Sequence, residues 1–206
     1  MAEKRRRLSR DDWVAAALAA LGEGGVGAVA IEPLAARLGA TKGSAYWHFA
    51  NRDELLAAAL QRWEHEETDA VIALVSAEPD PAVGLRTLLG AALAHPQQKL
   101  AVLLAGATDP LVEPVLTRVT VRRIEYLAEL FTRLGFADPV AKHRAALAYS
   151  AYLGTGQLWR TMRGTLPADH EAWESYVDEI WRVLTAPGPT GHEPAPGGAE
   201  SPRDSG

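Results

Sequence analysis

The feature that most constrains the fold of this 206-residue chain is the stretch at residues 30–52, AIEPLAARLGATKGSAYWHFANR. The apolar residues of its first half follow the i, i+3, i+4, i+7 spacing of an amphipathic helix: Ile31, Leu34, Ala35 and Leu38. Gly39 follows where a left-handed C-terminal cap favours a residue without a Cβ atom. A second helix is predicted over Lys42–His48, with the Thr41 hydroxyl as its N-cap. The pattern therefore predicts a helix-turn-helix unit.

The second helix of this unit is too short and too polar to form a core by itself. It offers a donor-rich and aromatic set of side chains within a turn and a half: Lys42, Ser44, Tyr46, Trp47 and His48. In helix-turn-helix proteins the second helix lies in the major groove and contacts base edges. The composition of this helix therefore favours DNA reading, while Phe49 directly after it is interpreted as the aromatic plug of a small core.

The residues from Ser44 to Leu56 read Ser-Ala-Tyr-Trp-His-Phe-Ala-Asn-Arg-Asp-Glu-Leu-Leu. This run closely resembles the signature of the tetracycline-repressor (TetR/AcrR) family of bacterial transcriptional regulators. That signature is an aromatic pair, His, Phe, a small linker, Asn or Ser, a basic residue and an acidic-leucine helix start. The resemblance covers roughly residues 9–63, and beyond them only the helical layout and the length agree. The sequence departs from the family at Ala30, where the family usually has Thr or Ser as a helix cap.

The resemblance implies which side chains contact DNA. Thr41 and Tyr46 are expected to bind phosphates and set the register, and Gly43 to allow close approach of the backbone. Ser44 and Trp47 are expected to point toward base edges or the sugar wall. The basic arm at the N-terminus would contact phosphates or the minor groove. The full set of expected DNA-binding residues is Arg5, Arg6, Arg7, Thr41, Lys42, Gly43, Ser44, Tyr46, Trp47, His48 and Arg52.

The net charge of −5 looks unfavourable for a DNA-binding protein until the chain is divided. Residues 1–52 carry eight Lys or Arg against five Asp or Glu, a balance of +3. Residues 53–206 carry thirteen against twenty-one, a balance of −8. This asymmetry indicates a nucleic-acid face at one end of the chain and a body with another task at the other end.

Helical periodicity continues to about residue 185 with no alternating strand pattern, which predicts an all-α fold of about nine helices. Ser9 with Asp12, and Asn51 with Glu54, have the spacing of capping boxes. Asp-Pro pairs are expected to start three of the helices. The predicted helices are about 10–22, 31–38, 42–48, 52–77, 81–94, 97–106, 110–134 (or from 113, because of Pro114), 139–163 and 170–185.

Three regions are expected along the chain. Residues 1–54 form the arm and a three-helix DNA-binding domain, and residues 55–186 form a helical domain for effector binding and dimerisation. Residues 187–206 hold five Pro and five Gly in twenty residues, a composition that predicts a disordered tail.

The last two predicted helices carry wide apolar faces. In the family that this chain resembles, these two helices form a dimeric four-helix bundle, which implies a homodimer here. The expected interface residues are Leu147, Ala151, Gly154, Leu158, Val177, Ile180, Trp181 and Leu184. The same residues also suit an intramolecular core, and for Trp181 the two interpretations have equal weight.

The resemblance also implies a small-molecule effector bound inside the C-terminal domain. Large side chains in the appropriate helices are the candidates for its pocket, although the same side chains suit a core: Trp63, Leu103, Tyr126, Phe131, Tyr152 and Trp159. With few charges inside this region, an apolar or aromatic ligand is expected.

Other classes of function find little support in the sequence. No stretch is long and apolar enough to span a membrane, and the charged N-terminus lacks the apolar run of a signal peptide. The absence of cysteine agrees with a cytoplasmic location. No cofactor is expected and no catalytic motif is found. The acidic run Glu64–Glu67 contains one His without a partner at i+4, so no metal site is expected.

These observations favour a ligand-responsive, DNA-binding transcriptional regulator. The expected function is that of a repressor that binds a palindromic double-stranded DNA operator as a dimer and is released by a small molecule. Two alternatives stay open. One is a DNA-binding protein whose C-terminal domain only dimerises. The other is a ligand-binding or enzymatic helical protein with a vestigial motif.

Overall fold

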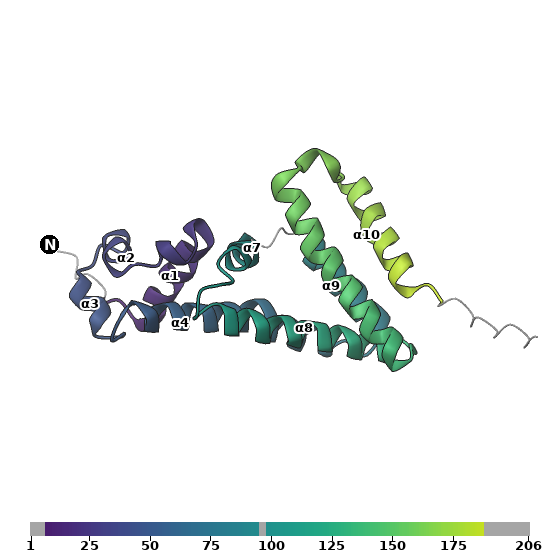
Figure 1. Ribbon diagram of the computed structural model, residues 1–206, viewed down its shortest axis with the longest axis horizontal. Coiled ribbons are helices and arrows are strands. Elements are labelled where there is room, and N and C mark those ends of the chain that lie inside the picture. Colours follow the sequence, from purple (N-terminus) through teal and green to yellow (C-terminus); the bar gives the residue numbers. More distant parts are fainter. Residues whose placement is uncertain (1–6, 95–97, 188–206) are drawn as a thin grey trace, which may run out of the picture.

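The computed structural model describes residues 7–94 and 98–187, and these residues form helices and turns without a β-strand (Figure 1). Arg5 and Arg6, and the tail from residue 188 onward, lie outside the described residues. The molecule is elongated, and the short helix α3 (Lys42–Tyr46) lies at one end of its long axis (Figure 1). The predicted all-α fold is confirmed.

The N-terminal bundle consists of α1 (Arg10–Gly24), α2 (Ile31–Arg37), α3 and α4 (Arg52–Glu64). α1 begins with the predicted capping box, because Asp12 N donates to Ser9 Oγ at 3.2 Å and Ser9 N donates to Asp12 Oδ2 at 2.7 Å. This helix continues two residues beyond its predicted end at Gly22. It closes at Gly25, whose φ of 75° favours glycine.

The start of α4 differs slightly from the predicted capping box. Asn51 Oδ1 accepts from Glu54 N at 2.9 Å, as predicted. The Glu54 carboxylate, however, accepts from Ala50 N at 2.7 Å, one residue before the cap. The helix start is therefore fixed by two side chains that satisfy amides on both sides of Asn51.

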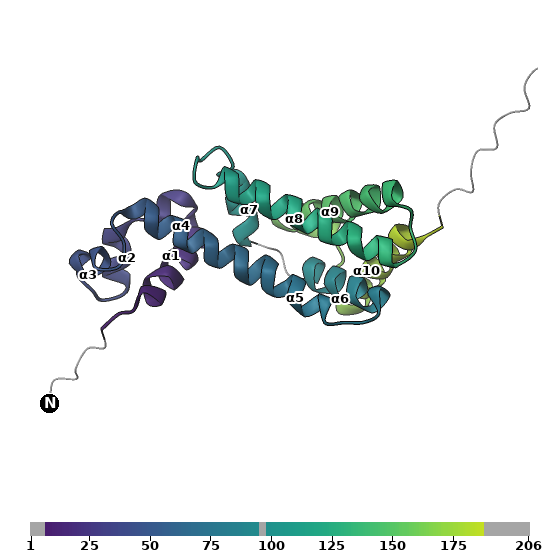
Figure 2. The same cartoon turned by 90° about the horizontal axis from the view of Figure 1, so that it is seen from below.

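The helix that leaves this bundle has a π-helical turn in its middle. α4 continues through η2 (His65–Asp69) into α5 (Ala70–Ser76) along nearly one line (Figure 2). The extent agrees with the helix predicted to about Ala77, but the sequence pattern did not predict the π turn. Such turns insert an extra residue into an α-helix and are frequent at functional sites.

The rest of the described chain forms the C-terminal body, which consists of η3 (Arg163–Thr165) and five helices: α6 (Pro81–Ala94), α7 (Gln98–Ala105), α8 (Glu113–Arg133), α9 (Asp138–Thr161) and α10 (His170–Thr185). α8 begins at the later of its two predicted starts, with Pro114 in its first turn. Counted with α4, η2 and α5 as one helix, the described residues contain nine α-helices, as predicted.

The three Asp-Pro pairs behave differently from one another. Asp80 Oδ1 accepts from Ala82 N at 2.8 Å and caps α6 as predicted. Asp109 Oδ1 accepts from Leu111 N at 2.9 Å, but this bond closes a turn that precedes α8. Asp138 is the first residue of α9, which places its carboxylate inside the first turn. Only the first pair therefore acts as a side-chain cap directly before a helix.

Two hydrophobic cores organise the described chain. The first joins α1–α4 to residues of the C-terminal body, namely Leu100 and Leu103 on α7 and Leu116 and Val119 on α8. The second lies among α5, α6, α8, α9 and α10. α8 contributes to both cores, so it connects the N-terminal bundle with the body. None of the helices in the described ranges has the length and apolar character needed to cross a membrane.

Candidate nucleic-acid interface and ligand cavities

α2 and α3 are joined by a turn that depends on Gly39. The φ of this residue is 62°, in the left-handed region that favours glycine. Ala40 N donates to Ala35 O at 2.8 Å, which closes the end of α2. The predicted left-handed cap is confirmed, and the chain enters α3 directly after it.

One face of α3 is anchored and the other is open. Ala45 is fully buried, and Phe49, just beyond the helix, is 1% exposed in the first core, as predicted for the aromatic plug. In contrast, Tyr46 is 55% exposed and Trp47 is 79% exposed. An indole with so little contact contributes almost nothing to the core, so both aromatic rings are available to a partner.

The polar residues at the start of α3 are also open to a partner. Thr41 and Gly43 are exposed and Ser44 is half-buried. The predicted cap by the Thr41 hydroxyl is wrong, because its side chain makes no capping hydrogen bond to α3. A Cβ atom added to Gly43 would meet only Thr41 Oγ1 at 3.8 Å, so packing within the chain does not require a glycine here.

The cation on this helix has an acidic neighbour. Lys42 Nζ donates to Glu32 Oε1 at 3.1 Å, and both side chains are exposed. The hydrogen bond to Glu32, together with its charge, raises the pKa of Lys42 above the ordinary lysine value. Lys42 therefore stays charged, and any phosphate that binds it competes with the Glu32 carboxylate.

Two of the expected DNA-binding residues, Arg52 and His48, contact backbone groups of the chain itself in this structure. Arg52 donates from Nε to Val29 O at 2.9 Å and from Nη2 to Val26 O at 2.6 Å, and Nη1 binds Asp53. His48 Nε2 lies 3.1 Å from Leu8 O. In this structure both side chains tie turns and the arm to the bundle, and their contact with DNA stays a prediction.

The other members of the predicted DNA set divide into two groups. Arg7 is exposed at the start of the described chain, whereas Arg5 and Arg6 lie outside it. The remaining residues gather on and beside α3: Thr41, Lys42, Gly43, Ser44, Tyr46 and Trp47. This surface combines hydrogen-bond donors, one cation and two open aromatic rings, which suits contacts with phosphates and base edges.

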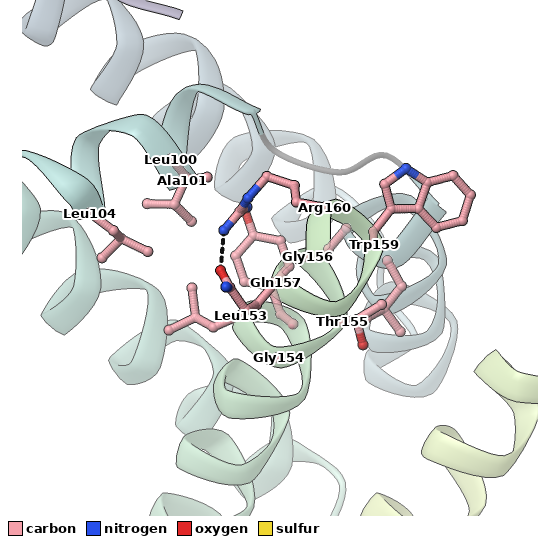
Figure 3. A pocket seen from close by; sticks show the side chains of 13 residues that line it. Leu100, Ala101, Leu104, Leu153, Gly154, Thr155, Gly156, Gln157, Trp159 and Arg160 are labelled. Carbon is pink, nitrogen blue, oxygen red and sulfur yellow. Dashed lines mark hydrogen bonds between the residues drawn. The ribbon is translucent and has the colours of Figure 1, made fainter. Parts of the chain in front are cut away.

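One cavity in the body, the α7 cavity, measures about 310 Å³ and lies between α6, α7 and α9 (Figure 3). Apolar side chains line most of it, and polar groups come from the last turns of α9. Arg160 donates to Gln157 at its rim, as the dashed line in Figure 3 shows. Its lining residues are Ala92, Leu93, Leu100, Ala101, Leu104, Tyr152, Leu153, Gly154, Thr155, Gly156, Gln157, Trp159 and Arg160.

The second cavity, the Arg123 cavity, measures about 150 Å³ and lies between η2, α5, α6, α8 and α9. It shares Ala92 and Tyr152 with the α7 cavity. Burial raises the pKa of Tyr152 to about 12, so its hydroxyl stays protonated at neutral pH. The lining residues are Glu67, Thr68, Val71, Ile72, Leu88, Leu89, Ala91, Ala92, Arg123, Tyr126, Leu127, Ala148, Tyr149 and Tyr152.

The predicted pocket residues are therefore only partly brought together. Tyr126, Tyr152 and Trp159 line one or both cavities. The other three line neither, and each is fully buried in a core: Trp63, Leu103 and Phe131. In this structure these three large side chains pack inside the cores, so their place in a ligand pocket stays a prediction.

Sequence reasoning missed the polar residues that connect α8 with the end of α4 and the π turn η2. Arg118 binds Glu64, and Arg122 Nη1 lies 3.1 Å from Asp69 Oδ1. Arg123 binds Thr68 and the backbone of Glu67. One signal was readable, because Arg123 lies four residues after buried Val119 and three before buried Tyr126, within the apolar stripe of α8.

The predicted dimer face divides between the two helices. On α9, Leu147 is 61% exposed, Ala151 is half-buried, and Gly154 and Leu158 are exposed. On α10, Val177 and Leu184 are buried in the second core, where α10 packs against α6 and α9, and this burial does not support their assignment to an interface. Ile180 and Trp181 are half-buried and pack against that core.

The N-terminal bundle matches a known family of sequences. Residues 14–59 match the family described as "Bacterial regulatory proteins, tetR family". The match runs from α1 to α4 and includes both helices of the helix-turn-helix. No curated protein sequence matches this chain.

Solved structures share the fold over nearly the whole chain. A TetR-family transcriptional regulator from Agrobacterium tumefaciens is 18% identical with a TM-score of 0.70, over 86% of this chain and 97% of that one. A transcriptional regulator from Rhodococcus sp. Rha1 is 21% identical with a TM-score of 0.66, over 86% and 94%. The multidrug binding protein EbrR, complexed with imidazole, is 25% identical with a TM-score of 0.59, over 89% and 98%.

Proposed function

Because this chain belongs to the TetR family of DNA-binding transcriptional regulators, we propose that it represses transcription as a homodimer on a palindromic operator and is released by a small molecule. Regulators of this family are not enzymes. In this proposal residues 1–54 read the DNA, and residues 55–186 bind the effector and form the dimer. A bacterial regulator that reads chromosomal DNA works in the cytoplasm, which is the location proposed here.

The observation that carries the proposal is the open face of α3. Trp47 and Tyr46 are largely exposed while Ala45 and Phe49, on the same short segment, are buried. The helix is therefore held firmly by one side and presents its aromatic and donor groups on the other. In a dimer, two such helices would enter successive major grooves, with centres roughly 34–36 Å apart.

Binding of DNA from upstream of the protein's own gene tests this proposal, measured by fluorescence anisotropy at two salt concentrations. We expect tight, salt-sensitive binding that persists over competitor DNA and is lost in Tyr46→Ala, because the phenol is an exposed group of the reading face. Leu74→Ala is the matched control, since Leu74 is 74% exposed on α5, far along the helix from α3.

A negative result with that fragment needs a second step, because the operator can lie elsewhere in a genome. In this second step, genomic DNA is fragmented and the fragments that the protein binds are selected and sequenced. If no fragment is enriched over random DNA, and Tyr46→Ala binds as weakly as the wild type, the helix-turn-helix does not read DNA. The proposal then fails, and the C-terminal body becomes the functional part.

The exposed face of α9 supports dimerisation. Leu147 and Leu158 are 61% and 37% exposed, and a Cβ atom on Gly154 would meet nothing within 4 Å. Small residues beside exposed leucines allow a second helix to approach closely. Sedimentation of Leu147→Glu tests this, with Val121→Glu on α8 as the control at a similarly exposed position. A wild-type monomer, or equal effects of the two variants, contradicts the proposed interface.

Release by a small molecule is supported by the two cavities between the helices of the body. The structural relative EbrR was solved with imidazole, a small aromatic ring, which supports an aromatic effector. A screen for compounds that raise the melting temperature identifies ligands of the folded state. Compounds that do so must also release operator DNA. A protein that binds its operator but responds to no compound only dimerises through this domain.

A further inference from the structure

We propose that the Arg123 cavity binds a compact apolar molecule that carries one anionic group, and that Arg123 supplies its counter-charge. This inference rests on the proposed function, because it names the chemical class of the effector. Three observations support it: the contacts of Arg123, the apolar character of the rest of the wall, and the size of the cavity.

Arg123 has no anionic partner among the described residues. Its guanidinium donates from Nε to Thr68 Oγ1 at 3.0 Å and from Nη2 to Glu67 O at 2.8 Å, both neutral acceptors. It also lies over the ring of Trp63, with Cζ 5.5 Å from the centroid. The Glu67 carboxylate lies near the cavity but is paired with Lys99 Nζ at 3.1 Å. The cavity wall therefore carries a half-buried positive charge that no carboxylate of the described chain neutralises.

An anionic ligand would complete this arrangement. A cation taken partly out of water is costly unless an opposite charge accompanies it. A carboxylate would form a charge-assisted hydrogen bond with the guanidinium, which is stronger than bonds to neutral oxygens. The hydroxyl of Tyr152 lies at the same wall, interacts with Arg123 and has a proton to donate, so it is a second donor. The site thus offers donors and a positive charge, which an amide or an alcohol would match less well.

The remaining wall and the volume restrict the rest of the ligand. Aliphatic side chains dominate the other sides of the cavity, for example Val71, Ile72 and Leu88. A cavity of about 150 Å³ is large enough for a benzene-sized molecule. One aromatic ring or a short aliphatic chain therefore fits, and a longer chain would pass Tyr152 into the adjoining α7 cavity.

Arg123 also connects the cavity with the long helix formed by α4, η2 and α5. Thr68 and Glu67 belong to the π turn η2, which continues directly from α4. The guanidinium has further N–H donors for a carboxylate, and a carboxylate that draws it toward the cavity would lengthen both of these hydrogen bonds. Occupation of the cavity would therefore loosen the hold of α8 on the turn between α4 and α5, and a ligand acts on DNA binding only to the extent that it favours this state.

Calorimetry on the full-length protein tests the cavity directly, with benzoate against benzamide and octanoate against octanamide as probes. We expect at least one acid to bind more tightly than its amide. In Arg123→Met the Kd of that acid should rise about 10- to 100-fold, while the amide is unaffected. Arg122→Met is the matched control, because it removes the same charge one residue away, where Arg122 contacts Asp69 on the same turn.

Three outcomes overturn the inference: amides that bind as tightly as acids, an Arg123→Met variant that binds the acid like the wild type, or no acid binding at millimolar concentration. The comparison of acid with amide needs only the wild type, so it holds even if Arg123→Met does not fold. Operator release is measured separately by anisotropy. Acid binding without release leaves the site assignment intact and refutes the regulatory part of the proposed function.

Discussion

Glu64 on α4 and Arg118 on α8, which are 54 residues apart in the sequence, form a bidentate ion pair. Arg118 Nε donates to Oε1 at 2.8 Å and Nη2 donates to Oε2 at 2.6 Å, and the Glu64 side chain is only 13% exposed. Together with Arg122 and Arg123, which contact residues of the π turn, this pair holds the long helix against α8 directly before that turn and within it. The orientation of α4 relative to the C-terminal body is therefore fixed by polar contacts as well as by the core.

Glu64→Gln should lower the free energy of unfolding by about 1 kcal/mol at neutral pH, because it removes the charge from a partly buried, paired carboxylate. The hydrogen bond from Arg118 holds the pKa of Glu64 below the ordinary glutamate value. A lowered folded-state pKa stabilises the protein above the unfolded-state value, about 4.3, and this contribution is lost as the pH falls below it. Chemical denaturation of both proteins between pH 7 and pH 3 measures the difference. A gap between them that stays constant down to pH 3 contradicts this account of the pair.

Trp47→Ala should leave stability within about 0.5 kcal/mol of the wild type and abolish operator binding, because the indole is 79% exposed. Phe49→Ala, two residues later, should lower stability by about 3–5 kcal/mol, because that ring is buried in the first core. Thermal unfolding and anisotropy on the same samples separate the two effects. A large loss of stability in Trp47→Ala would show that the indole packs within the protein.

Glu32→Gln should strengthen DNA binding, because Lys42 then has no carboxylate to leave when it meets a phosphate. The gain should appear as a steeper dependence of affinity on salt, by about one unit in the slope of log Kd against log salt concentration. Anisotropy titrations at several salt concentrations give this slope. In a Lys42→Met background the effect of Glu32→Gln on the slope should be smaller, and an equal effect there means that Lys42 does not contact phosphate.

Arg52→Met should destabilise the N-terminal bundle by about 2 kcal/mol, because the carbonyl groups of Val26 and Val29 lose a charged donor. Arg37→Met is the matched control. Arg37 binds Glu23 with two bonds of 2.7 Å, yet both side chains are exposed, so its removal should change stability by less than about 1 kcal/mol. Urea denaturation of the two variants decides whether Arg52 serves the fold. If Arg52→Met keeps full stability and loses DNA affinity, the phosphate contact was its task.

The helices and most of their ends follow from local chemistry, which explains why sequence reasoning placed them well. Ser9, Asn51 and Asp80 cap helices through bonds to amides within three residues, and Gly39 has the φ that its position in the turn required. Interactions over such short distances are visible in the sequence itself. The π turn is an exception, because neighbouring helices decide whether a helix accommodates an extra residue.

The ligand cavities and the dimer face were harder to predict, because they depend on residues that are distant in sequence. Periodicity identifies the apolar stripe of α10 but not what covers it, and Val177 proved to be buried by the chain's own helices. Size identified Trp63 and Phe131 as important, but a large side chain fills a space as readily as it borders one. Arg123 and Thr68 are 55 residues apart, so their contact appears only in the folded protein.

The way in which α3 is held has a consequence for how operator preference changes over evolution. Within that helix Ala45 is the only buried residue, while the side chains that face outward have little contact with the core. Substitutions at Lys42, Tyr46 or Trp47 therefore carry little risk of unfolding the protein. If these side chains contact DNA as proposed, single substitutions can change the preferred operator, and a library can randomise these positions without a redesign of the helix beneath them.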